Sequence, residues 1–256
     1  MFKRFFSRRS RIEAPDRPRF EGRPPTPDEP LAIVGDVHGE ISLLNVLIDK
    51  LQAQASDARW VFVGDFIDRG DHSAQVLSRL RDLAQDRPNT VFILGNHEEM
   101  MLSFLETPED AGNRWMRHGG LQTMASFGTF RLQTQNTPEM LIEARDKLMK
   151  CLPEGLVTWL SELPRYFISG NVAVVHAGAD PRKPIPEQKP QALTWGHMRI
   201  TQEARTDGLW VVHGHTIVDF PQESNGVISV DTGAYATGRL TAAIVRNGSV
   251  EFIQAT

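Results

Sequence analysis

Five short clusters in this chain combine glycine with side chains that can bind metal ions. They are Asp36-Val37-His38-Gly39, Gly64-Asp65-Phe66-Ile67-Asp68-Arg69-Gly70, Gly95-Asn96-His97-Glu98, His176-Ala177-Gly178 and Gly214-His215-Thr216. Glycine lets the backbone turn sharply, so that a neighbouring side chain can project from the end of an element. Carboxylate, amide and imidazole ligands without thiolate suit a catalytic manganese, iron(II) or zinc ion better than a structural zinc ion. Two such ions roughly 3.5–4 Å apart can hold an attacking hydroxide and a phosphate oxygen together, which requires one carboxylate to bridge them.

Each of the first three clusters follows a segment that predicts a buried strand. Residues 31–34, 60–63 and 90–94 are short apolar runs, which are typical of strands covered on both faces. Apolar residues within 41–51 and 76–84 recur with helical spacing. This alternation predicts a parallel α/β sheet, and ligands gather at the carboxyl ends of the strands in such sheets.

The rest of the chain predicts a mainly helical insert followed by mostly β structure. The insert covers residues 99–164. Further strands are expected over residues 165–169, 172–176, 209–213, 227–231, 240–245 and 250–254. Arg246-Asn247-Gly248-Ser249 predicts a hairpin turn. This order predicts an α/β fold of two packed mixed β-sheets flanked by helices, in one domain over residues 31–256.

The composition is that of an ordinary globular protein. The chain has 256 residues, of which 40% are hydrophobic and 23% charged, and its formal charge is −4. These values exclude global disorder, a coiled coil and a collagen-like chain, and the mild acidity argues against stable nucleic-acid binding. The single cysteine, Cys151, cannot form an internal disulfide, which favours a reducing, cytoplasmic setting. No apolar run in the sequence approaches the ~18 residues that a membrane helix requires.

Residues 1–30 differ from the rest and predict a flexible, basic, proline-rich tail. They hold eight basic against five acidic side chains and six of the sixteen prolines, without helical or strand periodicity. The first nine residues mix phenylalanine with lysine and arginine, a combination that could touch an anionic membrane surface. A solvated tail is the simpler interpretation, because short basic tails are common.

The five clusters, in this order, resemble those of the calcineurin-like metallophosphatases. The similarity is specifically to the phosphoprotein phosphatase branch, which includes the lambda phage and bacterial serine/threonine protein phosphatases. It extends over residues 31–245, and further matches are Trp115, Gly119-Gly120, Thr123, Ser126-Phe127-Gly128 and Val230-Asp231-Thr232-Gly233-Ala234. The resemblance implies a four-layer αββα sandwich. Five motifs in order make this far more specific than any one of them would be.

The resemblance also implies roles for individual residues. It implies six metal ligands, which are Asp36, His38, Asp65, Asn96, His176 and His215. Asp36 and His38 would hold the first ion, Asp65 would bridge both, and the other three would complete the second site. His97 would not be a ligand but would protonate the leaving oxygen, oriented by Asp68, while Arg69 would bind the phosphate.

The activity implied by the resemblance is hydrolysis of phosphoserine and phosphothreonine monoesters in proteins. A metal-bridging hydroxide would attack phosphorus directly, without a covalent enzyme intermediate. The expected cofactors are two divalent ions, manganese before iron or zinc. The expected partners are phosphorylated proteins, and the expected setting is the bacterial cytoplasm.

Two departures from the branch pattern bear on the substrate. Leu94 stands where most phosphatases of this branch carry arginine, as it does in symmetrical diadenosine tetraphosphatases. After Trp195, His197 occupies the usual place of a second phosphate-binding arginine, and Arg199 lies two residues further on. Either residue could make that contact, with Arg199 favoured. Hydrolysis of diadenosine tetraphosphate or another nucleotide is therefore the alternative activity. An inactive phosphoprotein-binding module is disfavoured, because no ligand or general acid of the pattern is missing.

The remaining histidines have simpler interpretations. His213 is expected to be a buried residue at a strand end and not a ligand. His72 and His118 are expected at the surface or behind the ligands, although His118 lies in the insert and could border the substrate. Ile217 stands where broader metallophosphoesterases place another ligand histidine, which disfavours a nuclease.

Overall fold

The first of two sheets places three parallel strands side by side. In a computed structural model, which describes residues 19–129, 135–197, 199–200 and 203–256, this sheet has the strand order β10-β9-β1-β2-β3. Its strands are β1 (Leu31–Val34), β2 (Arg59–Phe62), β3 (Val91–Phe92), β9 (Leu240–Arg246) and β10 (Ser249–Ala255). β1, β2 and β3 are parallel, as predicted, and β9 is antiparallel to β1 and β10. β3 is shorter than predicted because the N–H of Leu94 donates to the carbonyl of Pro164 and leaves the ladder.

The second sheet has the strand order β4-β5-β6-β8-β7. Its strands are β4 (Tyr166–Ser169), β5 (Val172–Val175), β6 (Trp210–His213), β7 (Gln222–Ser224) and β8 (Val227–Ser229). β5, β6 and β8 are parallel, while β4 and β7 run antiparallel at the two edges. The sequence analysis missed β7, because its three exposed residues carry no apolar alternation.

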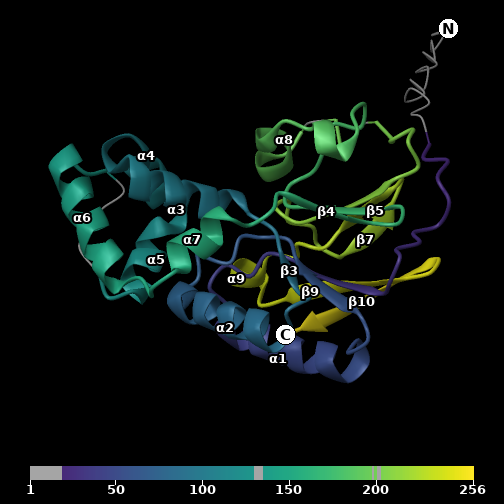
Figure 1. The fold of residues 1–256 in the computed structure, drawn as a ribbon, viewed down its shortest axis with the longest axis horizontal. Coiled ribbons are helices and arrows are strands. Elements are labelled where there is room, and N and C mark those ends of the chain that lie inside the picture. The colour runs from purple at the N-terminus through teal and green to yellow at the C-terminus, as the bar shows by residue number, and fades with distance from the viewer. Residues whose placement is uncertain (1–18, 130–134, 198, 201–202) are drawn as a thin grey trace, which may run out of the picture.

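Side chains of the first sheet alternate between two cores. Leu31 packs between the sheets with Val212 of the second sheet. The next residue, Ala32, packs toward α1 (Ile41–Gln54) and α2 (Ser73–Asp86), which cover the outer face. Both faces are therefore apolar, which explains the unbroken apolar runs of these strands. With the short helix α8 (Pro190–Trp195) above the second sheet, the molecule has the four layers that the sequence predicted (Figure 1).

Most of the remaining helices form one lobe beside the sheets (Figure 1). They are α3 (Asn96–Glu106), α4 (Pro108–Trp115), the π-helical turn η1 (Met116–Gly120), α5 (Leu121–Ser126), α6 (Pro138–Cys151) and α7 (Leu156–Ser161). Two shorter helices, η2 (Ile185–Glu187) and α9 (Ala234–Thr237), lie outside this lobe. Proline occupies the first turn of both α4 and α6, where its missing N–H is harmless. Gly119 interrupts the helical course with a φ of 111°, which only glycine adopts readily.

Residues 19–30 lie against both sheets, although the sequence analysis placed them in the tail. The carbonyl of Arg23 accepts from Trp210 Nε1 at 2.8 Å, and the carbonyl of Pro25 accepts from the N–H of Gly248 at 2.8 Å. The ring of Phe20 packs edge-on against Trp210, with centroids 5.0 Å apart. Residues 1–18 of the predicted tail, including the segment that could touch a membrane, lie outside the described residues.

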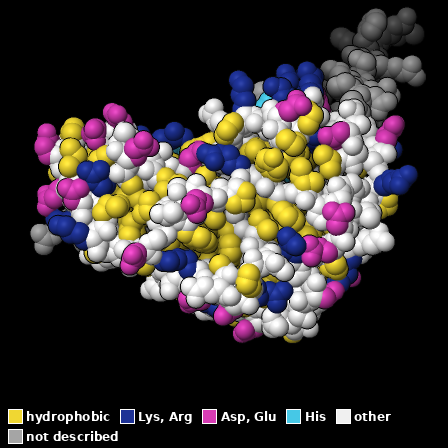
Figure 2. All heavy atoms as spheres, viewed as in Figure 1, with side chains coloured by type: hydrophobic (Ala, Val, Ile, Leu, Met, Phe, Trp, Pro, Cys, Tyr) yellow, Lys and Arg dark blue, Asp and Glu magenta, His cyan; other side chains and the backbone are white. Residues whose placement is uncertain are grey.

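Charges of both signs are interspersed on the face shown in Figure 2, around apolar side chains that gather across its middle. Within the described ranges, every helix is too short or too polar to cross a lipid bilayer.

Replacing Phe20 with alanine should lower the free energy of unfolding by about 1–2 kcal/mol, because the half-buried ring loses its contact with Trp210. Urea unfolding measures this value. The matched control is Phe220→Ala, which removes a ring that is 74% exposed and should change stability by less than about 0.5 kcal/mol. Equal effects of the two substitutions would show that the contact between Phe20 and Trp210 does not stabilise the fold.

Candidate metal centre

The ends of strands from both sheets bring the predicted ligands together. Asp36, Asp65 and Asn96 follow β1, β2 and β3, while His176 and His215 follow β5 and β6. His215 is half-buried and the other four are at most 2% exposed. The sandwich therefore places donors from distant parts of the chain at one edge.

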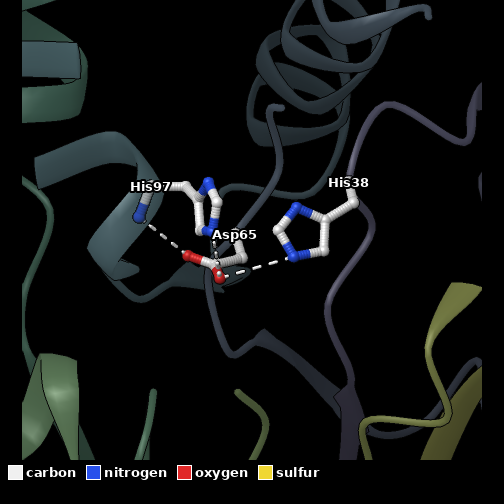
Figure 3. A group of neighbouring side chains, drawn as sticks. All are labelled: His38, Asp65 and His97. Atoms are coloured by element: carbon white, nitrogen blue, oxygen red, sulfur yellow. Dashed lines mark hydrogen bonds and ion pairs between the residues drawn. The ribbon is translucent and has the colours of Figure 1, made fainter. Parts of the chain in front are cut away.

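One group of donors surrounds Asp65 from the side of His38 and His97 (Figure 3). Asp65 Oδ2 lies 3.5 Å from His38 Nε2 and 3.8 Å from His97 Nε2. His38 Nδ1 is 2.8 Å from the carbonyl of Ile67. Because a carbonyl only accepts hydrogen bonds, His38 Nδ1 carries the proton and Nε2 keeps a lone pair directed at this group.

A second group of donors shares the same aspartate. Ligand atoms of Asp65, His176 and His215 lie within 4.8 Å of one another. Asn96 Oδ1 is 2.8 Å from both His176 Nε2 and His215 Nδ1. The carbonyl of Val63 accepts from His176 Nδ1 at 3.0 Å, which leaves Nε2 facing the group. Asp65 therefore stands between two sets of ligands.

Buried carboxyl groups repel one another in this centre. Asp36 Oδ2 accepts from the N–H of His215 at 2.9 Å, but Asp36 Oδ1 is buried without a hydrogen-bond partner. Burial, and then the charges of Asp231 and Asp65, raise the pKa of Asp36 well above its usual range. Burial likewise raises the pKa of Asp231 to about 6 and lowers that of His38 to about 3. An unpartnered carboxylate oxygen beside further carboxylates and neutral imidazoles fits divalent cations.

His97 forms a second functional unit with Asp68. Their Nδ1 and Oδ2 atoms are 2.7 Å apart, and Asp68 also accepts from Trp115 Nε1 at 2.8 Å and Thr123 Oγ1 at 2.6 Å. Burial by itself would lower the pKa of His97, but the carboxylates of Asp65 and Asp68 outweigh it and raise the pKa to about 9. An imidazolium is a proton donor and a poor ligand, so the pair suits the acid role better than metal binding. Trp115 and Thr123 come from the helical lobe, which thus helps to orient this pair.

Glu98 holds the loop that carries Asp65. Its carboxylate accepts from the N–H groups of Asp65 at 2.9 Å, Phe66 at 2.8 Å and Gly95 at 3.1 Å. The side chain is fully buried. The sequence analysis identified no role for Glu98, because nothing in the sequence shows which N–H groups a buried carboxylate will meet. Asp231 was named there only as part of a matching segment, and no role was assigned to it.

Several residues of the centre have a strained backbone. Six described residues other than glycine have a positive φ, and five of them are cluster residues, namely His38, Asp65, Asp68, Arg69 and His215. Such conformations cost about 1–3 kcal/mol each and persist only where the surroundings enforce them. Gly95 and Gly214 let the backbone approach two carboxylates closely. A Cβ at Gly95 would collide with the carboxylate of Asp65, and a Cβ at Gly214 with that of Asp36.

Arg69 lies beside the first group of donors. It donates from Nη1 to the hydroxyl of Tyr235 at 2.8 Å, and the edge of the Tyr235 ring meets His38 with centroids 5.3 Å apart. The sequence analysis did not single out Tyr235. The described contacts of Arg199 are elsewhere, since its Nε lies 3.6 Å from Glu203 Oε1. The phosphate-binding role of Arg199 stays a prediction.

The other histidines lie outside both groups of donors. His213 Nδ1 donates to the carbonyl of Gly214 at 2.8 Å, and its Nε2 lies 3.1 Å from Ser229 Oγ, in line with a buried strand-end residue. His197 Nε2 is 3.8 Å from Asp180 Oδ2. His118 Nδ1 is bonded to the carbonyl of Arg114, and His72 is exposed just before α2.

The chain belongs to the calcineurin-like phosphoesterases, whose family model matches residues 29–219. Members of this family use a dinuclear metal site, and the buried histidines and aspartates described above could bind such ions. The chain is 28% identical to the asymmetrical bis(5'-nucleosyl)-tetraphosphatase PrpE of Bacillus mycoides over 234 residues, which cover 82% of this chain and 87% of that protein.

Two solved structures share the fold. A candidate diadenosine tetraphosphatase superposes with a TM-score of 0.61 at 21% identity, covering 93% of this chain and 99% of that one. A protein serine/threonine phosphatase from Saccharomyces cerevisiae superposes with a TM-score of 0.55 at 16% identity, covering 90% and 80%, respectively.

Replacing Glu98 with glutamine should lower the free energy of unfolding by about 2–3 kcal/mol, because the amide group would direct a donor at backbone N–H groups. It should also weaken the binding of manganese, since the loop that carries Asp65 is no longer held. Urea unfolding and metal titration measure the two effects. The matched control is Glu106→Gln, at the exposed end of the same helix. A Glu98 variant as stable as this control would contradict the anchoring role.

Proposed function

We propose that this calcineurin-like phosphoesterase hydrolyses a phosphoanhydride bond of dinucleoside polyphosphates. The observation that carries the proposal is the similarity to a bis(5'-nucleosyl)-tetraphosphatase over 82% of the chain. Position 94 supports it, because Leu94 is a core residue with 3% exposure and provides no guanidinium for a compact phosphomonoester. The sequence analysis gave hydrolysis of diadenosine tetraphosphate or another nucleotide as the alternative activity.

Two divalent ions would be held by the two groups of donors that share Asp65. Asp36 and His38 are the proposed ligands of one ion, and Asn96, His176 and His215 those of the other, with manganese as the proposed metal. When bound, the ions would supply the positive charge that lowers the pKa of water and stabilises phosphate oxygens.

The reaction adds water across a P–O–P bond. The water oxygen bonds to one phosphorus, the bridging P–O bond of that phosphorus breaks, and the electron pair leaves with the departing phosphate. Arg69 would bind non-bridging oxygens, since its guanidinium lies at the edge of the centre beside Tyr235. His97, oriented by Asp68 at 2.7 Å, would give a proton to the departing oxygen.

Hydrolysis of phosphoserine and phosphothreonine in proteins is the second candidate. The observation that favours it is the buried Asp68–His97 pair. A serine alkoxide is a much stronger base than a departing phosphate, so a monoester needs this proton donor more than an anhydride does. The pair thus suits a substrate with a poor leaving group.

A comparison of substrates decides between the two candidates. With manganese, kcat/KM for diadenosine tetraphosphate should exceed that for a phosphoserine peptide by at least about tenfold, which corresponds to about 1.4 kcal/mol of transition-state binding. Separating the products shows whether the cut is asymmetrical, giving ATP and AMP, or symmetrical, giving two ADP. A preference for the peptide would overturn the proposal in favour of the second candidate. Repeating the assay with magnesium, zinc and iron tests the metal.

Replacing His97 with asparagine should lower kcat for the phosphoserine peptide by roughly 10²–10⁴-fold, and for an anhydride by less, because the departing phosphate is the weaker base. Bound manganese, measured by elemental analysis, should stay at the wild-type level. Asp65→Asn is the contrasting variant and should lose metal, because both groups of donors include Asp65. Loss of metal from the His97 variant would show that His97 is a ligand.

A further inference from the structure

A cavity of about 420 Å³ lies between the helical lobe and α8. It is formed by α3, α4 and the end of α8, and its main lining residues are Glu99, Met100, Ser103, Asp110, Arg114 and Trp195. In Figure 1, α8 lies to the right of α3 and α4, which form the other walls. A cavity of this size matches a small-molecule site.

Each helix that lines this cavity is connected to the metal centre, either along the chain or through a hydrogen bond. The helix α3 begins with Asn96 and His97, so Glu99 lies within a turn of both. The helix α4 ends at Trp115, whose indole donates to Asp68. In α8, the carbonyl of Leu193 accepts at 2.8 Å from the N–H of Ala177, the residue that follows His176. The helices that line the cavity therefore also carry or contact Asn96, His97 and Asp68 of the metal centre.

The indole of Trp195 forms a fixed aromatic surface in the cavity. Its Nε1 donates to Glu99 Oε2 at 2.6 Å, and Glu99 Oε1 accepts from Arg165 at 2.9 Å. The guanidinium of Arg114 lies 4.2 Å from the centre of the Trp195 ring. Both contacts hold the ring in place before any ligand arrives, which reduces the entropy lost on binding. The guanidinium covers a face of the half-buried ring, and the planar Arg114–Trp195 pair can stack with a flat group.

The cavity offers hydrogen-bonding groups suited to a base. Asp110 and Ser103 are exposed, and the carboxylate of Asp110 can accept hydrogen bonds from the exocyclic amino group of a base. The charge of Glu99 is offset by Arg165. That of Asp110 is offset by Arg114, so the described residues that line this face leave no cation over for phosphate. The phosphates would instead lie toward Arg69 and the metal centre.

We propose that this cavity binds a purine base of the dinucleoside polyphosphate, stacked on the Arg114–Trp195 pair. The inference rests on the proposed function and assigns one nucleoside of that substrate to the face between α3, α4 and α8. The base would remain outside the metal centre, and the polyphosphate would extend from the cavity into it. Trp195 is thus a specificity-determining residue for substrates that carry a base.

The test compares substrates with and without a base, using the manganese-loaded full chain. Trp195→Ala should raise KM for diadenosine tetraphosphate by roughly tenfold, because a stacked base is lost, and leave kcat/KM for p-nitrophenyl phosphate within about twofold. Trp195→Phe keeps a ring and should restore most of the dinucleotide affinity. Arg114→Gln should have an effect of the same kind, because the guanidinium that lies over the ring is lost. Its matched control is Arg117→Gln, which is exposed one turn further along and should change nothing.

A second arm measures binding without turnover. Calorimetric titration with a methylene-bridged analogue of diadenosine tetraphosphate should show the same loss of affinity in Trp195→Ala. If the wild type binds the analogue through Trp195 but hydrolyses only the phosphopeptide, the proposed function fails and the cavity assignment stands. Equal losses for both substrates would mean that Trp195 only positions α3, and this would overturn the assignment. Unchanged dinucleotide affinity, no binding of the analogue, or a loss confined to the phosphopeptide would overturn it as well.

Discussion

Mutual repulsion between buried carboxylates is the constraint on which the rest of this structure depends. Asp36, Asp65 and Asp231 are each at most 3% exposed. Burial and the charges of Asp231 and Asp65 raise the pKa of Asp36, and burial with the charge of Asp65 raises that of Asp231. The pKa of Asp65 is instead lowered, because His176, His97 and His38 surround it and outweigh its burial. Bringing such groups out of water is unfavourable unless cations join them, and Asp36 Oδ1 has no hydrogen-bond partner. The fold supplies the free energy that keeps them together, and this makes the centre a ready receptor for divalent ions.

Three features of the chain resist that repulsion. The Glu98 carboxylate accepts several backbone N–H groups of the loop after β2, which fixes the direction of the Asp65 side chain. Gly95 and Gly214 let the backbone approach the two ligand carboxylates more closely than any side chain would allow. Left-handed backbone at cluster residues then directs their side chains inward. Buried apolar side chains on the faces of the sheets provide the stability that offsets the cost of these strained positions.

The metal centre and the helical lobe have different parts in the proposed chemistry. The donors at the strand ends can serve any phosphate ester or anhydride, because they contact only phosphate and water. In the proposed chemistry the lobe would add the contacts that depend on the substrate, through Trp115 behind Asp68 and the cavity beside Trp195. A family with one centre can therefore act on substrates as different as a phosphoprotein and a dinucleotide.

The sequence by itself determined the chemistry and the order of the elements. Apolar runs predicted β1 and its neighbours, and the family resemblance carried by the five clusters implied six ligands. The structure brings these side chains together, because the ends of the strands that precede them meet at one edge. Only the tertiary structure decided what surrounds them. It joined Glu98 to the loop of Asp65, Trp115 to Asp68, Tyr235 to Arg69, and residues 19–30 to the two sheets. It also left Arg199 beside Glu203. Such contacts link residues far apart in the chain, and local sequence carries no record of them because they arise only when the layers pack.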